Sequence, residues 1–466
     1  MNLRVFNIFY PVRNVAFFLI EMFLIFFTLL IATVVKICLL DGRPFSLGEV
    51  FHKILLVTIV CILSLYYHDL YNFEIFSKES KLKVLVLRPL QTLGVASLVL
   101  ALIYFVFPNL IFAKAVVMVS LLLIIALVLS MRLLYYWALQ ENKLTEKVLV
   151  LGTNDFSINI VNEIEQKPYK GFKVIGVLKD QKMFDYYLNG VPILGKVDDV
   201  LEVTKKISYD RIVVSLMDQR GNLPLHQLLE LKLNGKQIHD GAEFYEHLTG
   251  KIIVERMRPS YFIFSNGFKR GAVRQWVKRL VDVVCSLLGL TLSLPISFLT
   301  AMAIKLESKG PVFYRQERVG KGGRLFTLCK FRSMYVNAET DIPVWAEISD
   351  TRVTRVGRVI RKLSIDEIPQ MFNVLKGDMS FVGPRPERPY FVDRLKEKIP
   401  YYNQRHAVKP GITGWAQIRF RYGASAEDAL EKLKYELYYI KNMSLLLDLA
   451  IVFETTKAVF MRSGAR

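Results

Sequence analysis

The adjacent carboxylates of Asp366 and Glu367 are the residues of this 466-residue sequence whose types and spacing are best suited to chemistry. Two interpretations of their segment are open. In the first, Ser364 and Glu367 form the capping box of a helix that Gly377 ends, and both acids are structural. In the second, helix N-terminal amides and Arg361 lower the pKa of Asp366, which is then an ionised nucleophile. Because adjacent carboxylates repel each other, a divalent cation would relieve that repulsion and polarise a phosphoryl oxygen.

Basic side chains and rigid turns flank the acidic pair in the sequence. The segment 310–334 supplies six cations that could surround a diphosphate or lipid phosphates. They are Arg315, Arg318, Lys321, Arg324, Lys330 and Arg332. After the pair comes a turn in which a glycine permits close approach and two prolines present an arginine rigidly. This turn consists of Gly383, Pro384, Arg385 and Pro386. Each fragment alone could be ordinary loop chemistry, but their ordered combination with a second Gly/Pro turn at 409–417 favours a functional site.

The elements that must position these residues begin with four apolar segments. Each is long enough to cross a hydrocarbon core of about 30 Å. They run approximately over Val15–Val35, Ile54–Leu70, Leu90–Phe107 and Ala115–Met131. They predict four transmembrane helices within residues 1–140, with the N-terminus and all that follows the fourth span in the cytoplasm by the positive-inside rule. Glu21 in the first span is expected to snorkel or to pair with another helix.

A further apolar stretch, Val283–Ile304, contains no charged residue. Its length alone predicts a transmembrane helix, but a fifth span would place the rest of the chain outside the cell. Basic residues flank both ends, and Pro295 near the middle removes a helix hydrogen bond. The sequence therefore favours a re-entrant helix-break-helix over residues 280–306, broken at Leu294 and Pro295.

Residues 146–268 alternate short β-rich runs with amphipathic helices, which predicts a small, parallel, Rossmann-like α/β domain. The first strand ends at Gly152, the first glycine of a dinucleotide fingerprint whose second and third glycines are missing. The nucleotide site is therefore predicted to be degenerate. A structural or assembly role is favoured over nucleotide binding.

The net charge of +20 is located mainly in the C-terminal half, because residues 251–466 carry 37 Lys and Arg against 20 Asp and Glu. Nucleic acid, anionic lipid and a phosphorylated substrate could each explain such an excess. Since the charge accompanies the apolar hairpin and the acidic pair, nucleic acid is the least favoured partner. Membrane lipids and a diphosphate substrate are the expected ones.

Four segments of the C-terminal part together resemble the bacterial sugar transferase family, the monotopic phosphoglycosyl transferases. They are Lys330-Phe-Arg-Ser-Met334, Ser364-Ile-Asp-Glu-Ile-Pro-Gln370, Gly377-Asp-Met-Ser-Phe-Val-Gly-Pro-Arg-Pro386 and Lys409-Pro-Gly-Ile-Thr-Gly-Trp-Ala-Gln417. The resemblance implies a mainly α, monotopic catalytic domain over residues 274–466. It also implies the transfer of a sugar 1-phosphate from a UDP-sugar to polyprenyl (undecaprenyl) phosphate. This reaction would be the first membrane step of exopolysaccharide or capsule synthesis, on the cytoplasmic face of a bacterial inner membrane.

The same resemblance implies roles for individual residues. Asp366 would attack the β-phosphorus of the UDP-sugar, expel UMP and form an aspartyl phosphosugar that polyprenyl phosphate captures. Glu367 would hold Mg²⁺, and Arg361 and Arg385 would contact the phosphates or the uridine. Glu436 stands where the family usually has a late aspartate of the site.

The N-terminal architecture resembles the large members of this family, which makes a homodimer plausible. Residues 240–250 and 258–261 resemble the exopolysaccharide subgroup that is associated with exosortase systems. Two other classes stay open. A membrane-bound nucleotide-sugar dehydratase or epimerase would need an intact glycine fingerprint and a distant Tyr-x-x-x-Lys pair, and the match from Tyr169 to Lys173 follows Gly152 too closely. A non-enzymatic membrane scaffold would be insensitive to loss of the Asp366 carboxylate.

Overall fold

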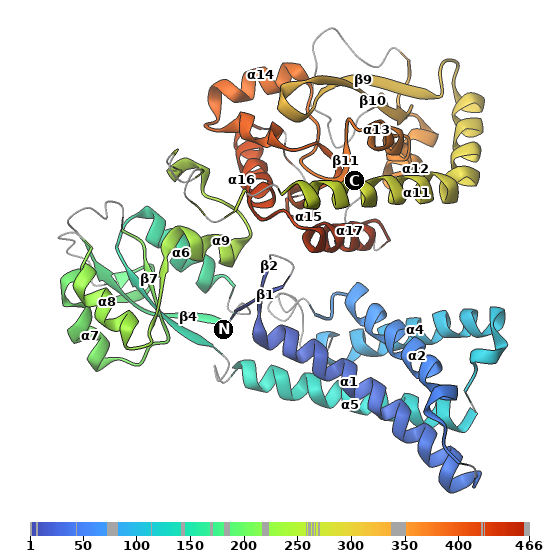
Figure 1. The fold of residues 1–466 in the computed structure, drawn as a ribbon, viewed down its shortest axis with the longest axis horizontal. Helices are drawn as coiled ribbons and strands as arrows, with labels where there is room; N and C mark the ends of the chain where they lie inside the picture. The colour runs from blue at the N-terminus through green and yellow to red at the C-terminus, as the bar shows by residue number, and fades with distance from the viewer. Residues whose placement is uncertain are drawn as a thin grey trace. The chain divides into compact units, whose positions relative to one another are not determined.

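The structure is a computed structural model that describes most of the chain (Figure 1). The described residues are 2–5, 8–42, 44–71, 83–112, 114–140, 145–167, 171–180, 187–216, 223–257, 259, 262, 265, 267–268, 271–336, 351–420, 423 and 425–460. The chain divides into two compact units, one of Met1–Leu3 and Phe9–Phe244, the other of Arg4–Ile8 and Tyr245–Arg466. Each unit is described by itself.

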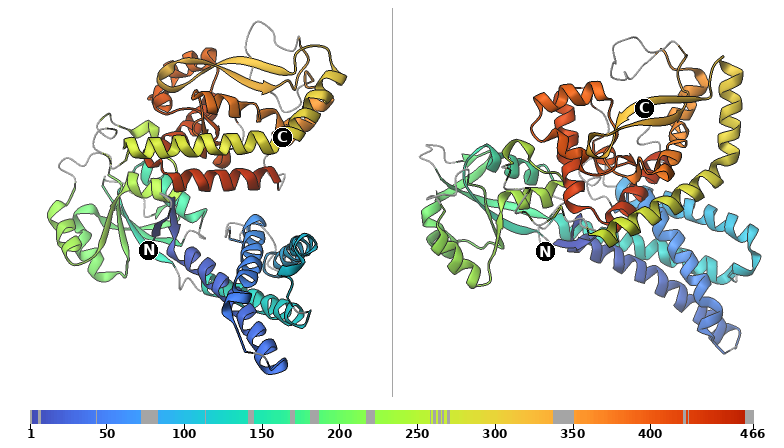
Figure 2. Two further views of the ribbon diagram at one scale, coloured as in Figure 1. Left: turned by 45° about the vertical axis from the view of Figure 1, so that its right-hand side comes forward. Right: turned by 45° about the horizontal axis from the view of Figure 1, so that its top comes forward.

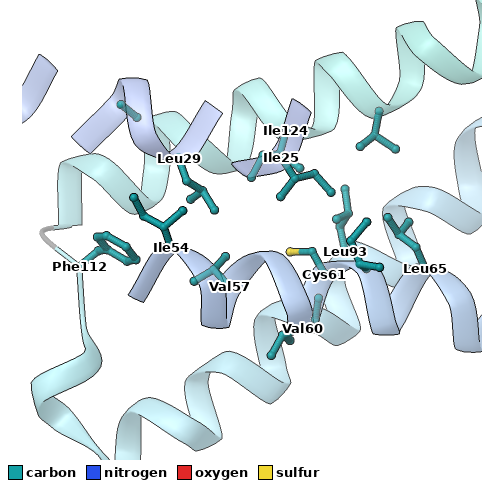
Figure 3. Close-up of a cluster of buried hydrophobic side chains, with 14 of the residues drawn as sticks. Ile25, Leu29, Ile54, Val57, Val60, Cys61, Leu65, Leu93, Phe112 and Ile124 are labelled. Carbon is teal, nitrogen blue, oxygen red and sulfur yellow. The ribbon is translucent and has the colours of Figure 1, made fainter. Parts of the chain in front are cut away.

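The first unit begins with the four predicted apolar helices, which are confirmed. After the short strands β1 (Asn2–Val5) and β2 (Ile8–Pro11) come α1 (Val12–Val34), which continues as the π-helix η1 (Val35–Leu40), and α2 (Leu47–Tyr67). They are followed by η2 (Lys83–Leu87), α4 (Arg88–Val106), η3 (Pro108–Leu110) and α5 (Lys114–Gln140). Aliphatic side chains from all four helices pack together, among them Ile25, Ile54, Leu93 and Ile124 (Figure 3). Most remaining apolar side chains face outward, as expected for helices in lipid.

Glu21 on α1 is paired with another helix, which is one of its two predicted states. Arg132 on α5 places Nη2 at 2.9 and 3.1 Å from the two carboxylate oxygens of Glu21. Its Nη1 donates to the carbonyl oxygen of Leu70 at 2.9 Å. Both charged side chains are fully buried, so the pair fixes α1 against α5 at a place where an unpaired charge would be costly.

The α/β part of the first unit confirms the predicted parallel sheet. Its strands are β3 (Glu146–Leu151), β4 (Phe172–Lys179), β5 (Tyr187–Leu188), β6 (Val191–Lys196), β7 (Arg211–Val214) and β8 (Gln237–Asp240). Its helices are α6 (Asp155–Glu165), η5 (Val197–Asp199), α7 (Val200–Lys206) and α8 (Leu225–Leu233), and α9 (Gly241–Thr249) extends into the second unit. The sheet order is β5-β6-β4-β3-β7-β8, and every pair except β5 with β6 is parallel. The strands that follow β3 first add on one side of it, as β4 and β6, and then on the other side, as β7 and β8. Folds of this kind bind ligands at such a switch point, here between β3 and β7.

The second unit is mainly helical. Its first part contains η6 (Val254–Arg256), α11 (Ala272–Glu307), and the antiparallel pair β9 (Phe313–Val319) and β10 (Leu325–Phe331), which are joined through η7 (Lys321–Gly323). Then come α12 (Arg355–Lys362), η8 (Ile365–Glu367), α13 (Gln370–Lys376), β11 (Ser380–Val382), α14 (Pro389–Lys398) and η9 (Tyr402–Ala407). The chain ends with β12 (Gly411–Thr413), α15 (Trp415–Arg419), α16 (Ala426–Asn442) and α17 (Leu445–Phe460).

The predicted break at Leu294 and Pro295 is not observed, since α11 is one helix of 36 residues with Pro295 inside it. Its ribbon instead changes direction partway along, so that its first and second parts form two arms at a clear angle (Figure 2). A proline inside a helix removes one hydrogen bond and crowds the preceding turn, which is enough to kink a helix without ending it. Only four of its side chains are buried, namely Asp282, Ser286, Thr300 and Ile304. Among the described residues, α11 is the fifth helix that is long and apolar enough to cross a membrane.

Candidate active site

The acidic pair lies on η8, between α12 and α13. Ser364, directly before η8, has a left-handed backbone with φ 56° and ψ 19°, and its side chain makes no capping hydrogen bond. A capping serine needs an extended backbone, so the predicted capping box is wrong. The prediction that Gly377 ends the following helix is confirmed, because its φ of 99° stops α13 and its N–H donates to the Asn373 carbonyl at 3.1 Å.

Glu367 accepts hydrogen bonds from two cations on the same oxygen. Lys330 Nζ, from β10, and Arg385 Nη2 each lie 2.9 Å from Oε1. Burial raises the pKa of Glu367, but Lys330 and Arg385 outweigh burial and lower that pKa to about 2. Glu367 is therefore ionised at neutral pH. Its hydrogen bonds hold Lys330 and Arg385, two of the predicted substrate-binding residues, next to the acidic pair.

Asp366 is buried, with 8% of its surface exposed. Burial raises its pKa; the charge of Lys330 opposes that rise, and the charge of Glu367 adds to it. Arg361 and Arg385 also act to lower the pKa of Asp366, without outweighing burial. The predicted lowering of this pKa is thus wrong, because desolvation of the carboxylate exceeds the attraction of the surrounding cations.

The turn that carries Arg385 is held against the second Gly/Pro turn. Strand β11 pairs in parallel with β12, and the Gly383 N–H donates to the Thr413 carbonyl at 2.9 Å. A Cβ on Gly383 would lie only 2.5 Å from the Lys409 carbonyl oxygen, so this close approach requires glycine. Two segments about 30 residues apart in the sequence therefore form one rigid support for the Arg385 side chain.

Glu436, on α16, accepts hydrogen bonds from a different arginine, Arg405, rather than from the cations that hold Glu367. Both of its carboxylate oxygens accept from Arg405, at 2.8 Å from Nε and 2.7 Å from Nη2. Burial raises the pKa of Glu436, and Arg405 opposes that rise. Arg405 also donates to the main-chain oxygen of Arg385 at 2.9 Å. The sequence gives no signal for Arg405, because its partners Glu436 and Arg385 come from two other segments.

Three predicted phosphate-binding arginines make other contacts in the structure. Arg318 donates to the Pro386 carbonyl at 3.0 Å. Arg332 is buried and donates to the Lys309 and Ser308 carbonyls, at 2.9 and 2.8 Å, just after the end of α11. Arg315 is exposed on β9, opposite Cys329 of β10. The structure thus assembles Asp366 with Glu367, Lys330, Arg361 and Arg385, while Arg318 and Arg332 serve backbone carbonyls.

Polar residues at the start of α11 fasten this helix to the site. Asp282 accepts from the Ser380 hydroxyl and the Phe381 N–H, both at 3.0 Å. Lys278 donates to the Val382 carbonyl at 3.2 Å and to Asp448 at 2.6 Å. The sequence suggested Lys278 only as a charge flanking an apolar stretch. In the structure, this end of the helix holds β11, the strand that leads into the Arg385 turn.

The turn after β3, in the first unit, uses its own polar groups. Asn154 Oδ1 accepts from the N–H groups of Phe156 and Ser157 at 3.0 and 3.2 Å. The Thr153 N–H and hydroxyl both donate to Asp180, at 3.1 and 2.8 Å. A Cβ on Gly152 would meet the chain's own backbone, at 2.8 Å from the Ser215 oxygen. These contacts occupy the donors that would otherwise receive a pyrophosphate.

Two family models match parts of this chain. Residues 273–462 match the family model described as bacterial sugar transferase, and residues 67–222 match one described as a CoA-binding domain. A UDP-glucose:undecaprenyl-phosphate glucose-1-phosphate transferase of Klebsiella pneumoniae is 35% identical over 333 residues, which cover 68% of this chain and 69% of the relative. The chain belongs to the bacterial sugar transferase family. It is a membrane protein with several apolar helices.

Two further relatives extend the comparison. The corresponding glucose-1-phosphate transferase of Xanthomonas campestris pv. campestris is 33% identical over 335 residues, or 69% of this chain and 68% of the relative. A UDP-N-acetylgalactosamine-undecaprenyl-phosphate N-acetylgalactosaminephosphotransferase of Aeromonas hydrophila is 42% identical over 261 residues, or 56% of this chain. The chain spans only 61% of that relative's length.

The residues of the α/β domain do not fit the diphosphate of coenzyme A at the turn after β3, because Asn154 already caps the first amides of α6. The subgroup associated with exosortase systems stays a prediction, and Arg258, Ser260 and Tyr261 of its second segment lie outside the described residues. Tyr169 of the considered Tyr-x-x-x-Lys pair also lies outside them.

Proposed function

We propose that this protein transfers a hexose 1-phosphate from a UDP-sugar to undecaprenyl phosphate and releases UMP, as the first step of a bacterial polysaccharide. The observation that carries the proposal is the buried Asp366 beside a carboxylate, Glu367, that holds Lys330 and Arg385. Phosphoryl transfer is catalysed mainly by positioning and charge neutralisation. A buried acid among fixed cations suits such a reaction better than it suits a scaffold.

The proposed reaction has two displacements at one phosphorus. First, an oxygen of the ionised Asp366 carboxylate bonds to the β-phosphorus, and UMP leaves with the bridging oxygen and its electron pair. Second, an oxygen of undecaprenyl phosphate bonds to the same phosphorus, and the aspartyl P–O bond breaks. The products are undecaprenyl diphosphate sugar and the restored carboxylate. Arg361 and Arg385 would bind the phosphates, and Lys330 would offset the negative charge that gathers near Glu367.

The acidic pair also fits a Mg²⁺ ion, which we propose as the cofactor. Among the described residues, no cluster of three or more His, Cys, Asp or Glu side chains is placed to hold a metal ion. Mg²⁺ commonly uses only one or two protein carboxylates together with substrate phosphates, and Glu367 is the proposed ligand. When bound, it would neutralise charge on the diphosphate.

The proposed site faces the cytoplasm at the surface of the inner membrane. Most of the exposed side chains of α11 are apolar, which suits contact with lipid, and its bent course suits re-entry rather than a straight span. A site fastened to this helix through Asp282 would meet a water-soluble nucleotide sugar and a lipid phosphate together. A homodimer, which the resemblance to the large members of the family implies, is a further part of the proposal.

The test measures UMP release by membranes that contain the full chain, with UDP-glucose and UDP-N-acetylgalactosamine as the first donors. We expect multiple-turnover release with one of them only when undecaprenyl phosphate is added, and label in a chloroform-soluble product. Asp366→Asn should abolish both. Asp393→Asn is the matched control, since Asp393 lies on α14 and is exposed. Full activity of Asp366→Asn would contradict the mechanism, and no release from any UDP-sugar would favour the scaffold.

A further inference from the structure

Arg405 is a buried cation whose contacts all lie within the protein. It is 4% exposed, and Glu436 holds it through two hydrogen bonds. Its Nη1 donates to the Tyr402 hydroxyl at 2.8 Å. Its Nη2 also donates to the main-chain oxygen of Arg385 at 2.9 Å. A buried charge is tolerated when it is fully paired, and this one is paired in a way that fixes a backbone carbonyl.

The neighbouring groups of the same turn are held in a similar way. The Gly383 N–H donates to Thr413, and the Pro384 carbonyl accepts from Gly411, both at 2.9 Å. The next carbonyl, of Arg385, accepts from Arg405, and that of Pro386 accepts from Arg318. Each of the four residues 383–386 thus has a main-chain group that is fixed by another segment, and two of the four donors are guanidinium groups.

This arrangement contrasts with the Arg385 side chain, which is 45% exposed. Its backbone is clamped, while its guanidinium reaches out to Glu367 at 2.9 Å. Glu436 and Arg405 are both only 4% exposed, and both carboxylate oxygens of Glu436 are occupied by Arg405. The hydrogen bond from Arg405 to the Arg385 carbonyl connects this pair to the turn that carries the exposed guanidinium.

We infer that Arg405 and Glu436 form a positioning pair that sets the Arg385 guanidinium where it can bind Glu367 and the diphosphate. This inference rests on the proposed function. It assigns Glu436 a role different from that of a residue in contact with substrate: the carboxylate orients Arg405, and Arg405 fixes the main chain of Arg385. Displacements of about 1 Å at a positioned group are enough to cost orders of magnitude in rate.

A double-mutant cycle tests this inference, with kcat/KM for UMP release as the readout. Arg405→Lys keeps the charge but loses the planar fork that serves Glu436 and the Arg385 carbonyl together. We expect Arg385→Ala and Arg405→Lys each to lower kcat/KM by about 10- to 100-fold. The double variant should be no worse than Arg385→Ala, because Arg405 then has no side chain left to position.

Multiplied losses in the double variant would overturn the inference, since they would mean that Arg405 acts independently of Arg385. Wild-type activity of Arg405→Lys would overturn it as well. If Arg405→Lys does not fold, the neutral pair Arg405→Met with Glu436→Leu takes its place in the cycle, because it removes both buried charges at once. Wild-type protein without UMP release would refute the proposed function instead, so the two failures are distinguishable.

Discussion

The turn after β3 and the turn before α13 both resemble sites for phosphates, yet they use their polar groups in opposite ways. In the first, Asn154 caps α6 and Thr153 binds Asp180, so the polar groups satisfy one another. In the second, Ser364 caps nothing and Asp366 is buried at an elevated pKa. In the first turn the polar groups bind one another, whereas the second turn holds a buried carboxylate whose pKa stays raised although cations surround it.

Resemblance to a dinucleotide-binding fingerprint, as at Gly152, is therefore a weaker sign of function than a buried carboxylate with a raised pKa, as at Asp366. Groups that saturate each other lower the free energy of the fold and have little left to offer a ligand. A carboxylate that stays desolvated is costly, and such sites are where function is usually found.

Lys330→Met should have the largest effect. Lys330 donates to Glu367 and is the strongest charge that counters the raised pKa of Asp366. Its removal leaves two carboxylates with less neutralisation, and we expect kcat/KM for UMP release to fall by about 10²- to 10³-fold, the usual cost of one stabilising group. The pH below which activity is lost should also move upward, because the pKa of Asp366 rises further.

Lys396→Met is the matched control for this experiment. Lys396 also pairs with a carboxylate, that of Asp393, but it is exposed on α14. It should leave kcat/KM and the pH profile unchanged. Equal effects of the two lysine variants would mean that the charges around Asp366 have no special role.

Much of the fold could be predicted from the sequence because its signals are local. Long apolar runs specify α1, α2, α4 and α5, and alternating strands and helices specify the parallel sheet. The sequence also indicated that Asp366 and Glu367 lie near Lys330 and Arg385, since all four residues belong to the segments that resemble the sugar transferase family.

The errors concern properties that depend on tertiary contacts. Ser364 has the residue type and spacing of a cap, but its backbone is left-handed, which neither residue type nor spacing reveals. Arg332 looks like a phosphate ligand, yet it satisfies carbonyls after α11 that no pattern reveals. Arg405 was missed because Glu436 lies 31 residues away. The pKa of Asp366 was misjudged because burial cannot be read from neighbouring residues.

A second prediction concerns stability rather than rate. A carboxylate whose pKa is raised in the folded protein stabilises the fold below its unfolded pKa, near 3.9, and that contribution is lost as pH rises through the folded pKa. Ionised Asp366 therefore destabilises the protein at neutral pH. We expect Asp366→Asn to raise the Tm at pH 7, although it abolishes activity, and the gain to shrink as pH approaches 4. Thermal unfolding in nanodiscs over that range measures it; a Tm at pH 7 below that of the wild type would contradict it.

The smallest effect is expected at the other turn. Asn154→Ala removes the cap of α6 and should cost about 1 kcal/mol of stability. Its kcat/KM for UMP release should equal that of the wild type, since no catalytic group lies on α6. Coenzyme A or NAD⁺ at millimolar concentration should leave the Tm of both proteins unchanged, because the capping side chain occupies the amides that a diphosphate needs. A ligand-dependent rise in the Tm of the wild-type protein would show that this turn still binds nucleotides, and the contrast between the two turns would then fail.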